Sequence, residues 1–486
     1  MRPILAAAAL SAATLPTMSA SGASAASAVS PAATPASVAA PAASAASVGA
    51  MPRLRLDARR ATLPNGLRVV LSVDHTSPTI AVDVMYDVGS RSEQNGHSGF
   101  AHLFEHMMFQ GSGNVARGEH MALVTSHGGT LNANTSADRT NYFDLLPESE
   151  LPLALWLEAD RMKSLDVSQS NLDNQRQVVE EEFRMRILNA PYVPAELRLE
   201  ELVFQGYWPY EHPTIGSMKD LDAATLEWVR AFHSAYYAPN EAVLAISGDF
   251  DPDVAMDRVR AYFGDAKANP NLPPYEPGPM SEQTAPRQDV VTDSHARFPA
   301  VSYGWAIPPS RTPDHYALEI AASILADGDS SRLHSELVHD RAIAIDVDAD
   351  TEDHRGPDLF EIEAKVSGKG TVAEVDKAIG AAVAALAKTP PTPTEMDKVR
   401  RRIASHFVTG LESNHARAER LAEFELYWGD AALLNDELDR YLAVTSEDVS
   451  KAVAKYLTAG RRSRVEVKPT VDTEPANAPK TKGAKS

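Results

Sequence analysis

Gly99-Phe-Ala-His102-Leu-Phe-Glu105-His106-Met-Met-Phe-Gln-Gly111 is the most informative stretch of this sequence. Its apolar spacing predicts a helix over Gly99–Phe109. On a helix, His102 and His106 project from one face and can hold a single metal ion. Glu105 shares that face and is placed to take a proton from water activated by the metal. The alternative is a chance spacing of two ordinary histidines in a chain that has 15.

A hydrolytic zinc ion needs a third protein ligand, which must be a histidine or a carboxylate because the chain has no cysteine. A second predicted helix, Ser168–Leu188, carries Glu180, Glu181 and Glu182. Glu182 lies at the edge of the helix's apolar stripe, with Gln175 two turns earlier, whereas Glu180 and Glu181 point away from it. We therefore favour Glu182 as the ligand over an ordinary solvated glutamate run. The stripe consists of Leu172, Val179, Phe183 and Ile187.

Strand and helix patterns alternate around these helices. Alternating apolar residues predict strands at Leu67–Val73 and Ile80–Val88, and a hairpin is predicted from Thr130–Thr135 and Arg139–Leu145. A further helix is predicted over Pro152–Leu165. Strands interleaved with helices on a half-solvated sheet predict an α+β fold with mostly antiparallel sheets flanked by helices.

The chain divides at a proline-rich segment, residues 269–286, that cannot continue a helix or a central strand. It separates a predicted zinc-binding domain, 55–268, from a second domain, 287–468. The two halves show a weak internal repeat, since an offset of 221 positions sets the segment beginning at Pro78 against that beginning at Pro299. We therefore expect two homologous α+β domains.

Composition limits the surroundings of the protein. Lys and Arg number 46 against 66 Asp and Glu, a net charge of −20 that argues against a nucleic-acid partner. Residues 1–25 resemble a secretory signal peptide, followed by an Ala/Ser/Pro-rich tether over 26–54, and no segment is long enough to span a membrane. We expect a periplasmic or secreted protein with a disordered tail at 469–486; the alternative is a disordered leader on a cytosolic protein.

These residues resemble the pitrilysin/insulinase family of zinc peptidases, whose signature is H-x-x-E-H, and its two-domain subunits of the mitochondrial processing peptidase type. The similarity extends over essentially the whole chain after the leader. The matching motifs are Gly99–Gly111, Asn132-Ala-Asn-Thr, Arg139-Thr-Asn-Tyr-Phe, Asn174-Gln-Arg-Gln-Val-Val-Glu-Glu-Glu, Pro209-Tyr-Glu-His-Pro-Thr-Ile-Gly-Ser and Ile324-Leu-Ala-Asp-Gly-Asp-Ser-Ser-Arg-Leu.

The resemblance implies that His102, His106 and Glu182 bind one Zn²⁺ per subunit and that Glu105 is the general base. It also implies a clam-shell arrangement of domains around a chamber. The substrate would be an unfolded peptide, added as a strand along Thr130–Thr135, where Asn132 and Ala133 would contact it. That segment is otherwise an ordinary surface hairpin.

Two departures from the family pattern stand out. Many relatives have a glutamate where this chain has Gln175, whose amide could still hydrogen-bond a ligand from outside the coordination sphere. Self-sufficient members also carry an Arg and a Tyr that hold the substrate carbonyl, and these positions are Val338 and Ile345 here. The second half has Ala322, Leu325 and Ala326 at the positions of the zinc motif and is not expected to bind zinc.

The sequence therefore predicts an exported zinc metalloendopeptidase subunit. We expect a homologous partner to supply the Arg/Tyr pair in a heterodimer, with a homodimer as the second possibility. Two alternative functions remain open: a non-catalytic structural or interaction subunit of a peptidase complex, and a processing peptidase dedicated to one peptide.

Overall fold

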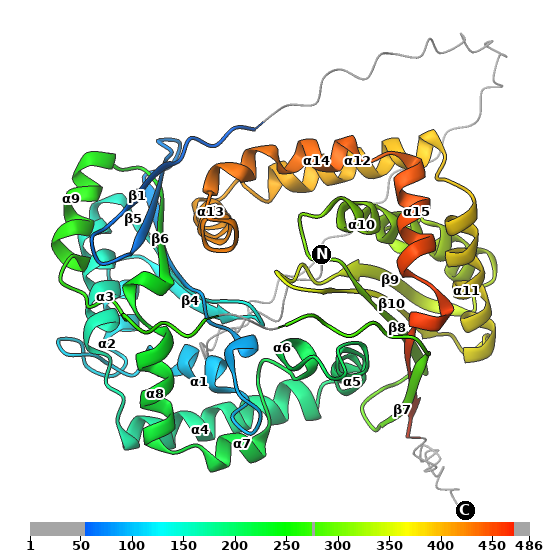
Figure 1. The fold of residues 1–486 in the computed structure, drawn as a ribbon, viewed down its shortest axis with the longest axis horizontal. Coiled ribbons are helices and arrows are strands. Elements are labelled where there is room, and N and C mark those ends of the chain that lie inside the picture. Colours follow the sequence, from blue (N-terminus) through cyan, green and yellow to red (C-terminus); the bar gives the residue numbers. More distant parts are fainter. Residues whose placement is uncertain (1–53, 275–277, 471–486) are drawn as a thin grey trace, which may run out of the picture.

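The computed structural model describes residues 54–274 and 278–470 of the 486-residue chain. Two α+β halves lie side by side, each built around one β-sheet (Figure 1). The predicted leader, tether and tail fall outside the described residues, except for Leu54 and residues 469–470. Within the described ranges, no helix is long and apolar enough to cross a bilayer.

The first sheet has six strands in the order β1-β2-β6-β3-β5-β4. The β2–β6 pair is parallel and every other pair is antiparallel. β4, the second edge strand, is the first arm of the predicted hairpin. The strands are β1 (Arg59–Thr62), β2 (Arg68–Val73), β3 (Thr79–Tyr86), β4 (Thr130–Thr135), β5 (Thr140–Pro147) and β6 (Ala242–Gly248).

The second sheet has five strands in the order β7-β11-β8-β10-β9, again with a single parallel pair, β7–β11. β2, β3, β4, β5 and β6 of the first sheet therefore correspond to β7, β8, β9, β10 and β11. Two of these pairs, β3 with β8 and β6 with β11, start 221 positions apart, the offset seen in the sequence. The second-sheet strands are β7 (Arg287–Asp293), β8 (Ala300–Ile307), β9 (Ala344–Thr351), β10 (Asp358–Val366) and β11 (Ser463–Pro469).

Helices cover both faces of each sheet. Those of the first half are α1 (Phe100–Met107), α2 (Glu119–Ser126), α3 (Leu151–Ser164), α4 (Gln169–Phe183), α5 (Val193–Val203), α6 (Trp208–Glu211), α7 (Met218–Ala223), α8 (Leu226–Tyr236) and α9 (Pro252–Phe263). Those of the second half are α10 (Pro313–Ala326), α11 (Val372–Lys388), α12 (Pro393–Thr409), α13 (Asn414–Trp428), α14 (Glu437–Ala443) and α15 (Ser446–Tyr456). The predicted helices and strands of the first half are present to within two residues at most ends, so the α+β expectation is confirmed.

The two halves exchange one helix each. α13 of the second half packs on the first sheet, where Leu421 and Phe424 join Val70, Met85 and Val243 in one buried cluster (Figure 1). α5 of the first half packs in the same way on β8 and β11 of the second sheet. Each sheet thus has one apolar face that is covered by a helix of the other half. Hydrophobic burial of these faces fixes the relative position of the two halves.

Ion pairs reinforce this junction. The Arg355 guanidinium in the second half donates to both carboxylate oxygens of Asp87 at 3.0 and 3.1 Å, and its backbone N–H donates to Asp138 at 2.9 Å. From the first half, Arg139 pairs with Glu419 of α13 at 3.0 Å. The junction is therefore polar as well as apolar.

A buried ion pair stabilises the second half. His315, in the first turn of α10, places Nε2 at 2.7 Å from Asp358 Oδ2, and both residues are almost fully buried. Burial alone would lower the pKa of His315, but its hydrogen bond to Asp358 and the nearby negative charge of Glu319 raise it well above its ordinary value. Burial would raise the pKa of Asp358, yet His315 and His354 lower it.

We expect His315→Leu to lower the free energy of unfolding by about 3–5 kcal/mol at pH 6, because Asp358 would be left as a buried charge without its partner. The imidazolium contributes fully below pH about 6.5, and its contribution is lost as pH rises through the raised folded pKa. The difference between wild type and variant should therefore shrink at alkaline pH. Urea unfolding of each variant measures the free energy of unfolding, and the exposed His295→Leu serves as the control. Equal losses of stability in the two variants would refute the stabilising role of the His315–Asp358 pair.

Candidate metal centre

Helix α1 is positioned by a buried carboxylate at its N-terminus. Glu93 accepts hydrogen bonds from the backbone N–H groups of Gly99 and Ala101, each at 2.8 Å. His212, from the Pro209–Ser217 motif, lies with Nε2 at 3.1 Å from the same carboxylate. Gly99 has φ +88°, and a Cβ there would lie 2.7 Å from the Ile215 carbonyl oxygen, so only glycine fits. The sequence analysis identified the motif that contains His212, but it did not predict that His212 contacts Glu93 at the start of α1.

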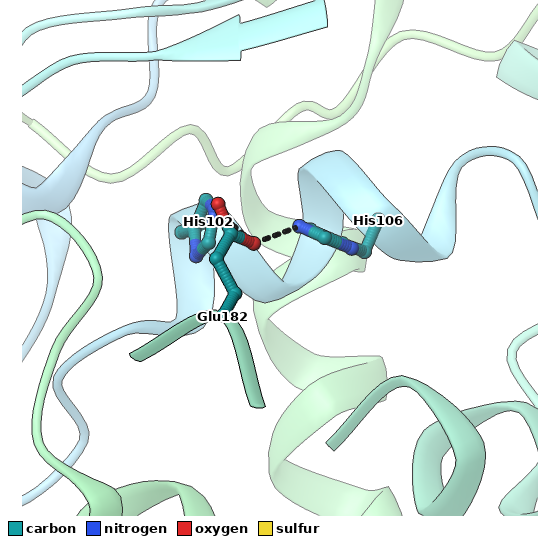
Figure 2. A group of neighbouring side chains, drawn as sticks. All are labelled: His102, His106 and Glu182. Carbon is teal, nitrogen blue, oxygen red and sulfur yellow. Dashed lines mark ion pairs between the residues drawn. The ribbon is translucent and has the colours of Figure 1, made fainter. Parts of the chain in front are cut away.

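His102 and His106 project from α1 on the side of Glu182, with their rings nearly perpendicular and their centroids 4.8 Å apart (Figure 2). Glu182, near the end of α4, points its carboxylate at both rings. Its Oε2 lies 3.7 Å from His102 Nε2 and 3.2 Å from His106 Nε2. The structure therefore brings together the three residues predicted as ligands, from two helices far apart in the sequence.

The environment keeps these groups in the forms that bind metal. Burial, together with the neighbouring His106, lowers the pKa of His102 to about 3, so its imidazole is neutral near pH 7. Burial would raise the pKa of Glu182, but His106, His102 and Arg186 lower it, so the carboxylate is ionised. Arg186 pairs with the other carboxylate oxygen, Oε1, at 3.0 Å.

The three residues fit a divalent metal ion. His106 Nε2 is buried and forms no hydrogen bond with any described residue, although it directly faces Glu182. Ligand atoms of His102, His106 and Glu182 all lie within 4.8 Å of one another. Two imidazoles and one carboxylate, with a further position left for water, form a donor set typical of hydrolytic zinc sites.

The burial of α4 explains why Glu182 is the glutamate that reaches the site. Leu172, Val179 and Ile187 are buried, and Glu182 has 8% of its surface exposed on the same side. Glu181 is exposed, and Glu180 is only partly covered. The three glutamates thus lie where the apolar stripe of the sequence predicted them. Phe183, the fourth residue of that stripe, is only half-buried.

Glu105 lies between the two histidines in sequence and is 4% exposed. The Thr135 hydroxyl, at the end of β4, donates to its Oε2 at 2.6 Å. No described residue donates a hydrogen bond to Oε1. Burial raises the pKa of Glu105, while the Thr135 hydrogen bond opposes that rise. The structure therefore holds this carboxylate in a fixed orientation beside the imidazoles; the link to Thr135 was not foreseen from the sequence.

Gln175 is buried on α4 two turns before Glu182. Its amide donates to Asn174 Oδ1 at 2.8 Å, and no hydrogen bond joins it to the two histidines or to Glu182 in the described structure. The predicted contact between this amide and a ligand therefore stays a prediction.

The strand predicted to bind substrate is the edge strand β4. Asn132 and Ala133 pair with Phe143 and Tyr142 of β5 on one side, and none of the described strands pairs with the other side. Asn132 is partly exposed, whereas the Ala133 side chain is buried in the core. Since β4 also contacts α1, its unpaired backbone groups lie beside the helix that carries His102 and His106.

The positions of the second half that correspond to the zinc motif are apolar. Ala322, Leu325 and Ala326 of α10 are buried apolar residues and cannot bind metal. Val338 is half-buried against the second core, and Ile345 on β9 is 43% exposed. Neither side chain can donate a hydrogen bond to a substrate carbonyl.

Known proteins with similar sequences include several zinc proteases. The chain is 31% identical over 414 residues to the zinc protease PqqE of Helicobacter pylori, covering 84% of this chain and 92% of that protein. It is 29% identical over 418 residues to an uncharacterized zinc protease of Mycobacterium tuberculosis, covering 85% and 93%. The crystal structure of a Helicobacter pylori protease matches with a TM-score of 0.80 and 30% identity, covering 85% of this chain and all of that one.

Two family models match the two halves in order. Residues 68–203 match the insulinase, or peptidase M16, family, and residues 223–403 match the peptidase M16 inactive domain. The second model agrees with the apolar residues Ala322, Leu325 and Ala326 at the zinc-motif positions of α10. The order of these matches and the similarity to the Helicobacter protein lead to one conclusion: the chain belongs to the peptidase M16 family, which includes insulinase and pitrilysin.

Proposed function

We propose that this chain is the zinc-bearing subunit of an exported metalloendopeptidase that hydrolyses unfolded peptides. The observation that carries the proposal is the convergence of His102, His106 and Glu182 beside the oriented carboxylate of Glu105. The zinc-protease names of the relatives support a peptidase role. The leader-like residues 1–25 are the basis for proposing export to the periplasm or outside the cell.

Bound zinc would supply Lewis acidity, which lowers the pKa of water to about 7 and polarises a peptide carbonyl. Glu105 would accept the water proton on Oε1, because Oε2 is held by Thr135. The same carboxyl group would then return the proton to the leaving amide nitrogen. Arg186 would keep Glu182 ionised and oriented toward the two imidazoles.

The substrate would bind as an additional strand along β4. An extended peptide can hydrogen-bond to the unpaired backbone groups of Asn132 and its neighbours, which places one of its peptide bonds beside Glu105. This recognition requires an extended backbone rather than a particular side chain, so unfolded peptides are favoured over folded proteins.

A second subunit would complete the site. Val338 and Ile345 replace the Arg/Tyr pair expected of self-sufficient relatives, so a group that holds the substrate carbonyl would come from a homologous partner. We propose a heterodimer; a homodimer is the second arrangement. Val338 and Ile345 also favour the competing function, a non-catalytic subunit of a peptidase complex. A third possibility, a dedicated processing enzyme, differs from these two in cleaving a single peptide.

Metal analysis and a peptide assay test the proposal together. We expect the purified chain to contain one zinc ion and to cleave a quenched unfolded peptide slowly, with a rise of at least about 100-fold in the complex with its Arg/Tyr-bearing partner. A zinc chelator should abolish cleavage in both samples. Full activity of the chain alone would refute the heterodimer, and a complex without zinc or cleavage would favour the non-catalytic subunit.

A further inference from the structure

A cavity of about 260 Å³ lies in the second half, between α11 and α15 and over strand β8. Tyr303 and Trp305 of β8 form its floor and are almost fully buried. The Trp305 indole N–H donates to the Thr458 carbonyl oxygen at 3.0 Å, which orients the ring. In Figure 1, α11 and α15 lie on the side of the second half that faces away from the first sheet. The cavity is therefore separate from the metal centre.

The walls of the cavity are mostly apolar. Ile379, Val383 and Leu457 are buried and line it. Gly380 and Ala384, on the exposed side of α11, are small and leave the space open. The lining residues of α11 extend from residue 379 to residue 388, about 14 Å along the helix, so the cavity is elongated. A concave, largely apolar space with a few polar groups is typical of a site for a small molecule.

The charged residues that line the cavity, Lys388 and Arg462, are both positive. The Arg462 guanidinium lies over the Tyr303 ring, with Cζ 5.2 Å from the ring centroid, and its Nε is buried without a hydrogen-bond partner. Neither cation forms an ion pair with another described residue. Asp376, which accepts a hydrogen bond from the Tyr303 hydroxyl, pairs with Arg464 at 3.3 Å. In a chain of net charge −20, these two cations favour an anionic ligand here.

The two cations lie at opposite ends of the cavity. Arg462 is near the start of α11, because it lies over Tyr303, whose hydroxyl contacts Asp376 in the second turn of that helix. Lys388 is the last residue of α11. One carboxylate can therefore contact only one of them. Arg462 is the better partner, because its position is fixed by the Tyr303 ring and a guanidinium can bind a carboxylate through two hydrogen bonds.

The internal repeat shows what covers α3, the helix of the first half that corresponds to α11. The two helices start 221 positions apart, so Ala384 at the rim of the cavity corresponds to Lys163. Lys163 Nζ donates to the Tyr262 carbonyl oxygen at 3.1 Å and to the Asp265 carboxylate at 3.0 Å. The end of α9 and the residues after it therefore lie against α3 at this position.

The same segment reaches α8, the counterpart of α15. These helices start 220 positions apart, so Ala454, another lining residue, corresponds to Ser234. The Asn269 side-chain amide donates to the Ser234 carbonyl oxygen at 3.1 Å. Residues 262–269 thus run from α3 to α8 and cover, in the first half, the place that is open between α11 and α15. In the second half, Ala384 and Ala454 are exposed.

We infer that this cavity binds a medium-chain carboxylate, with its apolar chain between α11 and α15 and its carboxylate on Arg462. A volume of about 260 Å³ holds roughly nine water-sized groups of about 30 Å³ each, which matches a chain of about eight carbons with its carboxylate. The inference goes beyond the proposed peptidase activity and does not depend on it.

The segment 471–486 is the other candidate occupant, because it follows β11 as α9 follows β6. Arg462 immediately precedes β11, so a chain that returns to it must travel back along the seven residues of that strand. Such a path brings Lys480, rather than Asp472 or Glu474, toward Arg462. Two like charges repel, so we favour the carboxylate over this segment.

Binding of octanoate to the full chain tests the inference without a peptidase assay. We expect equilibrium dialysis with radiolabelled octanoate to show one molecule per chain, with a Kd of about 10⁻⁴–10⁻³ M. Octylamine has the same apolar chain with a positive charge and should compete about 10-fold less well. Octanoate binding that octylamine inhibits as strongly as unlabelled octanoate does would overturn the assignment of the charge.

Two variants test the two parts of the site. Arg462→Gln should weaken octanoate binding by about 10-fold or more, because the carboxylate loses its charged donor. Gly380→Leu should abolish saturable binding by filling the cavity. A Cβ at Gly380 would have no atom within 4 Å, and leucine favours a helix more than glycine does, so this variant should fold.

Lys377→Gln is the matched control, because Lys377 is exposed on the same helix and does not line the cavity. It should bind octanoate like wild type, and Lys388→Gln should weaken binding only about threefold, as expected of a more distant charge. A chain that ends at Thr470 should also bind like wild type. Binding about 10-fold tighter in that shortened chain would show that residues 471–486 fill the cavity and would overturn the inference. No saturable binding up to about 10 mM, or unchanged binding in both Arg462→Gln and Gly380→Leu, would overturn it as well.

Discussion

Glu105→Gln is expected to lower kcat/KM for peptide cleavage by about 10²–10⁴-fold while leaving the zinc content unchanged. The general base contributes a factor of that size, and glutamine cannot accept the proton. The substitution keeps the shape of the side chain and an oxygen that accepts from the Thr135 hydroxyl. It should therefore remove the chemistry without moving α1. The measurement is steady-state cleavage of a quenched peptide by whichever form is active, the chain alone or its complex with the partner. Zinc is determined in the same sample.

The matched control is Glu181→Gln on α4, one residue before the proposed ligand. Glu181 is exposed, and its carboxylate pairs with Arg184 at 2.9 Å. Its replacement should leave both cleavage and zinc unchanged. Activity of Glu105→Gln near that of Glu181→Gln would show that Glu105 is not the base, and loss of zinc from Glu105→Gln would show that its role is to bind the metal.

Glu182→Gln is expected to weaken zinc binding by at least about 100-fold, and to reduce cleavage at low zinc by a similar factor. Loss of a group outside the coordination sphere already costs 10–100-fold in affinity, so loss of a charged ligand should cost at least the upper value. Arg186 adds to the effect, because it would lose the carboxylate with which it pairs at 3.0 Å. Competition with a chromophoric chelator gives the affinity.

Excess zinc separates the two variants. Added zinc should restore part of the activity of Glu182→Gln by mass action, whereas it should not help Glu105→Gln. Glu180→Gln, in the same helix but only partly covered, serves as the control for charge removal near α4. Normal zinc affinity in Glu182→Gln would mean that another residue provides the third ligand.

Local pattern was enough to predict most elements of the first half. The spacing of apolar residues placed α1, α3 and α4 and the strands β2 to β5, since such periodicity follows from the backbone geometry of each element alone. It also placed His102, Glu105 and His106 on one helical turn and selected Glu182 from three successive glutamates. The repeat offset of 221 positions reappears in the strand starts of both sheets.

Other features depend on contacts that no local pattern encodes. The exchange of α5 and α13 between the halves follows from which apolar faces meet after folding, and the proline-rich segment at 269–286 gave no sign of it. The roles of Glu93 and His212 at the start of α1 also join residues more than one hundred positions apart. The sequence alone does not distinguish these two residues from its other histidines and carboxylates, because it does not show which elements are in contact.

The sequence by itself determined the two ends of the metal centre, a pair of imidazoles on α1 and an inward-facing carboxylate on α4, because helical periodicity fixes the direction of each side chain. Only the tertiary structure decided that the Glu182 carboxylate comes within 3.2 Å of His106 and that Thr135 orients Glu105. The physical reason is that the packing of helices and the register of strands are set by burial across the whole chain, which brings together residues whose separation in sequence carries no information about their distance in space.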